Sequence, residues 1–185
     1  LPWIAAAGIC AGLMHATKET SVIAFVAMLL SVLLVSVTSK DHSDRSWCKQ
    51  LNKTHLAVGL LAAAFVSILF YSSFFTNPAG IADSFKTYTT YLNRASVNHL
   101  HIHPWYYYLD LLVYVEGLES SMWNEDFIVV FACLGAFFAL KQTNNKLLRF
   151  IAFYTITMTV VYSAIPYKTP WCLLGFFHGM VLLAG

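Results

Sequence analysis

Three histidines at alternate positions open the chemically most varied stretch of the chain. His99, His101 and His103 precede a proline, Trp105 and three consecutive tyrosines. In an extended backbone alternate side chains point to the same side, so the three imidazoles would share one face. Such a face could bind zinc or another divalent cation, but no carboxylate or cysteine is close in sequence to complete a ligand set. Contacts to hydroxyl or phosphate groups of a substrate, or a structural role, are the other interpretations.

Two lysines and one arginine have surroundings that suit an anion. Lys18 and Lys168 each stand shortly before a predicted helix, whose N-terminus offers free N–H donors and a favourable dipole to a phosphate. Arg94 ends an amphipathic stretch, 83–94, and its planar guanidinium also suits a phosphate. Simpler explanations exist, because both lysines could reach lipid head groups from the end of a helix and Arg94 could pair with Asp83 or a lipid.

Residues near these cations could take part in acid–base catalysis or in sugar binding. Glu19 would serve as a general base only if it pointed into a cavity, and neutralisation of Lys18 is its alternative role. Aromatic rings such as Trp105 and Tyr167 can stack on sugar faces while polar groups beside them bond hydroxyls. Aromatic residues also gather at membrane interfaces, so these rings alone do not decide between the two roles.

Apolar helices must position all of these residues. Of the 185 residues 58% are hydrophobic, which excludes an ordinary soluble domain, and the net charge of +2 gives no argument for a nucleic-acid partner. Because a bilayer core requires about 20 apolar helical residues, the long apolar runs are candidate membrane helices, all of them uncharged except that 122–140 carries acids at its start. These runs are 1–16, 20–39, 56–76, 122–140, 150–165 and 170–185.

The distribution of Lys and Arg predicts an orientation. The basic links 40–53 and 141–149 should both face the cytoplasm, which places 77–105 outside. The chain must cross the membrane an odd number of times between 105 outside and the link 141–149 inside. If 106–118 and 122–140 both crossed, that link would lie outside, so 106–118 should lie along the outer surface or re-enter. The same reasoning places 15–20 and 166–170 outside, and the polar stretches converge on one face. We therefore predict an all-α polytopic membrane protein, with 77–121 as an outer loop that carries surface or interfacial helices.

Three motifs resemble a known superfamily. They are GLMHATKET at 12–20, HPWYYYL at 103–109 and YSAIPYKTPW at 162–171. Together they resemble the prokaryotic dolichyl-phosphate-mannose–protein mannosyltransferase-like superfamily, and most of all its flippase-activity-associated membrane proteins of the archaeal glycosylation type. The resemblance implies the GT-C fold, a transmembrane helix bundle with extracytoplasmic loops.

The resemblance also implies a function. In that superfamily a sugar is taken from a polyprenyl-phosphate donor on the extracytoplasmic face and given to a protein, lipid or glycan acceptor, in this case at a prokaryotic cytoplasmic membrane. It makes Lys18, Arg94 and Lys168 candidates for the donor phosphate, and the rim of the sugar or acceptor site is expected at His101, His103, Trp105 and Tyr167.

The family's catalytic acid lies in a first outer loop, which is expected before Leu1. Residues 1–185 are accordingly interpreted as a fragment of one transmembrane domain with five to six membrane helices. The partners expected are a polyprenyl-phosphate-linked sugar, membrane lipids and the acceptor, with a divalent cation as the one cofactor considered. The alternative function is a non-catalytic transporter or flippase-associated component that handles lipid-linked sugars.

Overall fold

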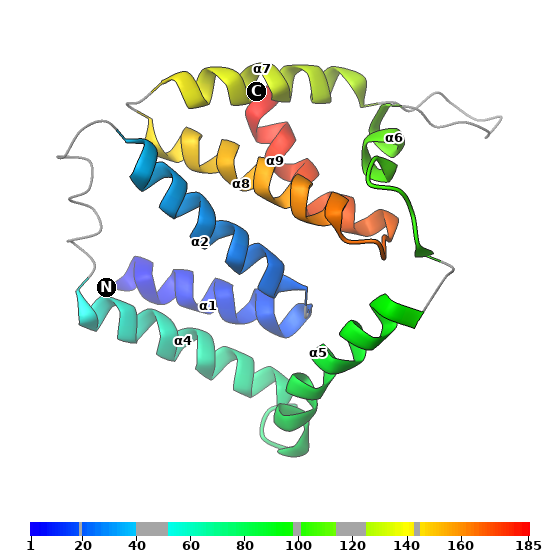
Figure 1. The fold of residues 1–185 in the computed structure, drawn as a ribbon. Coiled ribbons are helices and arrows are strands. Elements are labelled where there is room, and N and C mark those ends of the chain that lie inside the picture. Colours follow the sequence, from blue (N-terminus) through cyan, green and yellow to red (C-terminus); the bar gives the residue numbers. More distant parts are fainter. Residues whose placement is uncertain (19, 40–51, 98–100, 114–124, 143–144) are drawn as a thin grey trace. The chain divides into compact units, whose positions relative to one another are not determined.

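The part of the chain that the structure describes is built from helices (Figure 1). The computed structural model describes residues 1–18, 20–39, 52–97, 101–113, 125–142 and 145–185. Within these ranges the one β pairing is a bridge between Ile102 and Tyr167. The helices are α1 (Pro2–Thr17), α2 (Ser21–Thr38), α4 (Lys53–Tyr71), α5 (Ala79–Val97), α6 (Tyr107–Val113), α7 (Asp126–Lys141), α8 (Lys146–Ala164), the 3-10 helix η3 (Pro170–Leu173) and α9 (Leu174–Ala184).

The chain divides into two compact units. Unit 1 comprises Leu1–Val22 and Asp41–Val97, and therefore holds α1, α4 and α5. Unit 2 comprises Ile23–Lys40 and Asn98–Gly185, and holds most of α2 together with α6 to α9. The predicted site residues are split between them, because Lys18 and Arg94 belong to unit 1 and the remaining described ones belong to unit 2.

Three of the described helices are long and apolar enough to cross a membrane, by length and composition: α2, α4 and α8. They correspond to the predicted spans 20–39, 56–76 and 150–165. Large apolar side chains such as Leu61, which is 69% exposed, cover their outer surfaces, and extended apolar surface of this kind suits contact with lipid. α1 and α7 have 16 residues each, and Pro170–Ala184 is a shorter apolar helix. Three predicted spans therefore match helices of membrane-crossing length, and the number of five to six membrane helices stays a prediction.

Glycines let α1 and α4 pack closely in unit 1. Gly8 and Gly12 are one helical turn apart on the face of α1 that meets α4. A Cβ placed on Gly12 would lie 2.6 Å from the carbonyl oxygen of Ala63 and 2.8 Å from the Cβ of Val66. Small residues at this spacing are typical of close helix pairs in membranes, where backbone approach supplies much of the packing.

Gly12→Ala is therefore expected to destabilise unit 1 by about 1–3 kcal/mol, because the new methyl group meets backbone that cannot rotate away. Thermal unfolding in detergent micelles measures the change. Gly59→Ala is the matched control on α4, since its Cβ would lie at ordinary contact distances, 3.4 Å from the Cγ2 methyl group of Ile4 and 3.8 Å from the carbonyl oxygen of Ile4. Equal melting temperatures for the two variants would contradict the packing described.

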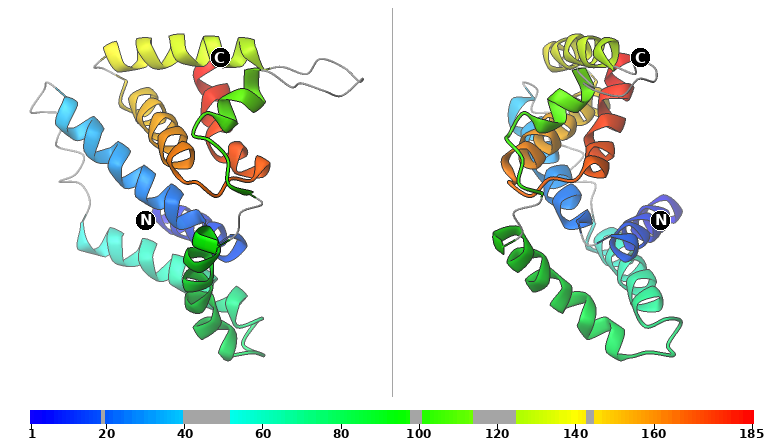
Figure 2. Two further views of the ribbon diagram at one scale, coloured as in Figure 1. Left: turned by 45° about the vertical axis from the view of Figure 1, so that its right-hand side comes forward. Right: turned by 90° about the vertical axis from the view of Figure 1, so that its right-hand side faces the viewer.

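Unit 2 is built around α7, α8 and α9, which pack against one another (Figure 2). Their contact is close where Gly135 of α7 meets the backbone at Leu183, and where Gly179 of α9 meets Thr155 of α8. The short helix α6 contacts the start of α7, because the backbone N–H of Glu125, the N-cap residue of α7, donates to the carbonyl of Leu112 at 2.9 Å. α6 itself has seven residues, far fewer than a bilayer crossing requires.

The end of α2 and the start of α8 lie together in unit 2. Arg149 of α8 donates to the hydroxyl of Ser39 at 3.2 Å and to the hydroxyl of Thr38, which ends α2. The C-terminus of α2 therefore lies beside the N-terminus of α8, in agreement with links 40–53 and 141–149 on one side. Arg149 itself differs from expectation, because it lies inside α8 with 2% of its surface exposed and not in a solvated link.

Candidate functional site

Two of the three motifs lie side by side in unit 2. The backbone N–H of Lys168 donates to the carbonyl of His101 at 2.8 Å, and the N–H of His103 donates to the carbonyl of Pro166 at 3.2 Å. These two bonds flank the antiparallel bridge between Ile102 and Tyr167. The histidine stretch and the 166–170 stretch therefore lie together, as their predicted location on one face requires.

Aromatic and imidazole rings gather along the paired segments. The ring of His101 meets Tyr167 edge-on, with centroids 5.3 Å apart, and His103 stacks on Tyr107 at 4.0 Å with an interplanar angle of 18°. Trp105 follows and is 66% exposed. We call His101, His103, Trp105 and Tyr167 the aromatic rim. Its composition suits a sugar, because flat faces are offered beside groups that can bond hydroxyls.

Lys168 is buried at the base of this rim. It is 1% exposed, and its ammonium donates to the carbonyl of Ile165, which caps the C-terminus of α8. Burial lowers the pKa of Lys168. The sequence predicted a lysine that reaches outward to phosphate, whereas the structure encloses the side chain between the end of α8 and the start of η3.

The charge of Lys168 has no carboxylate beside it within the described parts of the chain, where the one ion pair joins Lys86 and Asp83. An ammonium has three donors, and over the same residues Ile165 is its single acceptor. A buried cation that keeps free donors is electrostatically suited to a phosphate oxygen. The arrangement also has a structural benefit, since a cation at a helix C-terminus interacts favourably with the dipole of α8.

Tyr108 fixes the loop that carries Lys168. It is buried against Tyr162 and Phe176, and its hydroxyl donates to the carbonyl of Thr169 at 3.2 Å. Burial, and then the neighbouring thiol of Cys172, raise the pKa of Tyr108, so its hydroxyl keeps its proton and remains a donor. Sequence reasoning missed this role. The usable signal was helical spacing, because Tyr108 and Leu112 are four residues apart and both are buried.

Tyr108→Phe is expected to lower the free energy of unfolding by about 1 kcal/mol, because it removes one buried hydrogen bond and leaves the Thr169 carbonyl without this donor. Chemical denaturation of the purified protein measures the loss. Tyr106→Phe alters the half-exposed neighbouring tyrosine and should change stability little. A loss of equal size at both positions would contradict the anchoring role of Tyr108.

The helix predicted after Lys168 begins as η3. Pro170 occupies the first turn of η3, and Thr169 is at the N-cap position. The Thr169 hydroxyl makes no capping bond, however, and instead lies 3.1 Å from the sulfur of Cys172.

The remaining predicted residues lie elsewhere. Lys18 is exposed at the C-cap of α1, where its carbonyl accepts from the N–H of Ser21 at 3.0 Å. Arg94 lies in α5, in a part of that helix whose side chains are not described. Glu19 and His99 lie outside the described residues. The structure therefore brings Lys168 together with the aromatic rim, and Lys18 and Arg94 stay predictions as its partners.

The hypothesis of a metal site at three histidines stays a prediction, because His99 lies outside the described residues. Within the described ranges no group of three or more His, Cys, Asp or Glu side chains is placed to hold a metal ion. His101 and His103 contact aromatic rings instead.

A second polar cluster, which sequence reasoning missed, lies in unit 1. His15 contacts the hydroxyl of Ser67 at 3.2 Å and that of Tyr88 at 3.0 Å, and its carbonyl accepts from the hydroxyl of Tyr71 at 2.7 Å. The cluster links α1, α4 and α5. Its signal was present, because His15 follows Gly8 and Gly12 at helical spacing on the face that meets α4.

Comparisons of the chain with models of protein families, with curated proteins and with solved structures found no match.

Proposed function

We propose that the chain is part of a multi-pass membrane glycosyltransferase, which transfers a sugar from a polyprenyl-phosphate donor on the extracytoplasmic face. The observation that carries this proposal is the pairing of 101–103 with 166–168. It sets a buried lysine without a carboxylate neighbour, over the described residues, next to the half-buried rings of His101 and Tyr167. A lipid-phosphate sugar needs both features, a cation for the phosphate and flat rings for the sugar.

The chemistry of transfer explains why the cation matters. When the bond between sugar and phosphate breaks, negative charge develops on the departing lipid phosphate. A preorganised cation in a site of low dielectric stabilises that charge without reorganisation. In this proposal Lys168 supplies the cation, and Tyr108 with the backbone pairs holds it in place.

The aromatic rim binds the sugar or the acceptor in this account. Trp105 offers an exposed ring, and His101 and His103 offer imidazole nitrogens to hydroxyl groups. Lys18 and Arg94 are proposed as further phosphate ligands, on the strength of the resemblance and their charge. The transfer also requires a general base near the acceptor.

Sugar transfer by the full-length protein in membranes tests this function, with a radiolabelled polyprenyl-phosphate sugar as donor. The double variant Lys168→Ala, Arg94→Ala should lose most of the turnover, because two proposed phosphate ligands are removed together. Lys86→Ala is the control, since Lys86 is an exposed lysine that already pairs with Asp83. Turnover unchanged in the double variant would remove the phosphate site from the proposal.

A further inference from the structure

The turn between α4 and α5 has an unusual backbone. Ser73, Phe74 and Phe75 have φ angles of 49°, 59° and 68°, in the left-handed region. Residues with a side chain rarely adopt this region, and for bulky residues it is a strained conformation. Three such residues in succession require surroundings that hold them there. We call residues 72–77 the phenylalanine turn.

Hydrogen bonds hold the phenylalanine turn in this shape. The N–H of Phe74 donates to the carbonyl of Leu69 at 2.8 Å, and the N–H of Asn77 donates to the carbonyl of Ser72 at 2.8 Å. The buried hydroxyl of Ser72 accepts from the N–H of Phe75 at 3.0 Å. These bonds satisfy backbone groups that the end of α4 leaves free. The turn is therefore a defined structure.

The strain turns two large apolar rings outward. Phe74 is 63% exposed and Phe75 is 61% exposed. Phe74 meets the ring of Phe70, itself exposed, with centroids 5.6 Å apart. A strained backbone that directs apolar rings away from the protein is unfavourable in water, where burial of those rings would be the stable outcome. An apolar environment around the rings would remove that cost.

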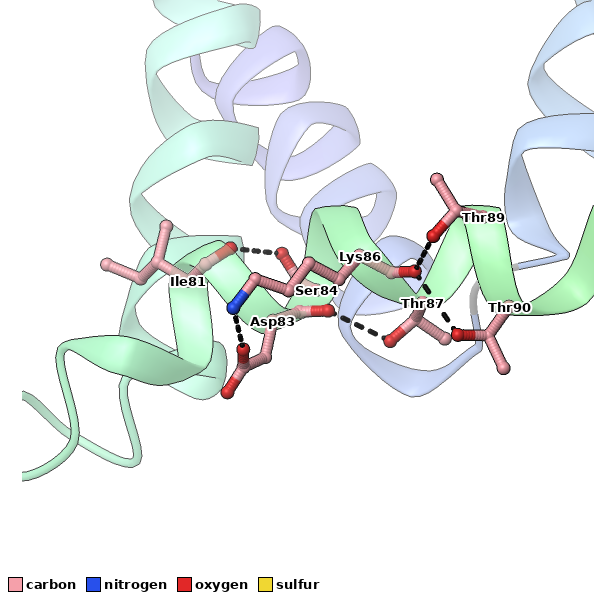
Figure 3. Close-up of polar contacts among 7 residues, drawn as sticks. All are labelled: Ile81, Asp83, Ser84, Lys86, Thr87, Thr89 and Thr90. Atoms are coloured by element: carbon pink, nitrogen blue, oxygen red, sulfur yellow. Dashed lines mark hydrogen bonds and ion pairs between the residues drawn. The ribbon is translucent and has the colours of Figure 1, made fainter.

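The neighbouring helices indicate which environment this is. α4 is of membrane-crossing length, Val66 is its one buried residue, and it ends at Tyr71 directly before the turn. α5 then begins a different pattern, with the Asp83–Lys86 ion pair and hydroxyl groups of Thr87, Thr89 and Thr90 (Figure 3). Exposed Phe85 interrupts this polar surface. A membrane-length helix followed by an amphipathic one places the turn at the level of the lipid head groups.

We propose that the phenylalanine turn is a lipid anchor, in which Phe74 and Phe75 insert into the acyl-chain edge of the bilayer while α5 lies along the head groups. The anchor rests on the membrane placement in the proposed function and not on sugar transfer. Its occupant is the lipid surface, because the apolar surface of the turn continues that of α4.

Spin labels on single cysteines test the anchor. The full-length protein with its native cysteines replaced is labelled after Phe74→Cys or Phe75→Cys and placed in phosphatidylcholine–phosphatidylglycerol vesicles. Collisions with oxygen report apolar surroundings, and collisions with a water-soluble nickel chelate report aqueous ones. Labels at residues 74 and 75 should collide mainly with oxygen. Lys86→Cys, at an exposed polar position, should collide mainly with nickel.

Two results would overturn the anchor. Nickel collisions at residues 74 and 75 as frequent as at residue 86 would show a turn in water, and protection from both reagents would show a turn covered by protein. Leu61→Cys, in the middle of α4, separates this failure from failure of the membrane placement. A label at residue 61 that collides mainly with nickel would remove the placement itself.

A second measurement covers variants that fail to fold. Phe75 is replaced by benzoylphenylalanine, which keeps an aromatic ring, and the protein is irradiated in vesicles with radiolabelled acyl chains. Labelled lipid joined to the protein supports the anchor. Cross-links confined to protein would contradict it.

Discussion

Lys168→Met is expected to leave the protein folded and at least as stable, while it lowers sugar transfer by about 100-fold to 1,000-fold. The loss follows from the proposed role, because removal of one preorganised charge-stabilising donor typically costs that much in rate. The stability follows from burial. A buried charge without a carboxylate partner is costly, and an apolar side chain of similar length avoids that cost.

The lowered pKa of Lys168 gives this variant a pH signature. Between the folded-state pKa and the ordinary lysine value of 10.5 the unfolded chain binds more protons than the folded one, so stability rises with pH in that window. Below the folded-state pKa the cost of the buried charge is fully present. In Lys168→Met the part of the rise in stability with pH that comes from the Lys168 ammonium should be absent. The free energy of unfolding, measured from neutral pH to pH 10.5, tests this, with Lys86→Met as the control. A Lys168→Met protein that keeps full sugar-transfer activity would contradict the role of Lys168.

Gly135→Val is expected to prevent the normal packing of α7 on α9, with a loss of about 3 kcal/mol or more in unfolding free energy. Even the Cβ of an alanine at this position would lie well under 3.0 Å from the carbonyl oxygen of Leu183, closer than real Cβ atoms come to a neighbour. That oxygen belongs to the backbone of α9, so it cannot rotate away and the whole helix must move. The rim and Lys168 depend on this packing through Tyr108, which contacts Phe176 of α9.

Gly175→Ala provides the comparison on α9. Its Cβ would meet the terminal methyl group of Met158 at 3.3 Å, and that flexible end can move by a few tenths of an ångström. We expect a change within about 1 kcal/mol at this position, partly offset by the higher helix propensity of alanine. Thermal unfolding in detergent micelles separates the two variants. A Gly135→Val protein that melts at the wild-type temperature would contradict the helix contact.

The sequence was a good guide to the membrane-length helices and a poorer guide to their ends. Charge-free runs predicted α2, α4 and α8 within a few residues, because a long apolar helix has a strong local signal. The predicted run 56–76 ends early, at Tyr71, because the left-handed residues of the phenylalanine turn follow. α5 begins at Ala79, earlier than the amphipathic pattern indicated, where Gly80 fits against the carbonyl of Tyr71.

The site was predictable in outline only. Charge distribution placed His101–Tyr108 and 166–170 on one face, and the structure shows them paired. The burial of Lys168 could not be predicted, because a Pro-Tyr-Lys-Thr-Pro sequence has the composition of a surface turn. Its loop is fixed by Tyr108 of α6, which is distant in sequence, as well as by the adjacent end of α8. Arg149 was misjudged for the same reason, since its partners Thr38 and Ser39 lie on another helix.

The most direct test follows the fate of a doubly labelled donor, with one isotope in the sugar and another in the polyprenyl chain, in vesicles that contain the full-length protein and an acceptor. Sugar transfer predicts that the two labels separate, with the sugar on the acceptor and the polyprenyl phosphate left in the membrane. Movement of the intact donor across the bilayer with both labels together, and no labelled acceptor, would contradict the enzyme and support a flippase component.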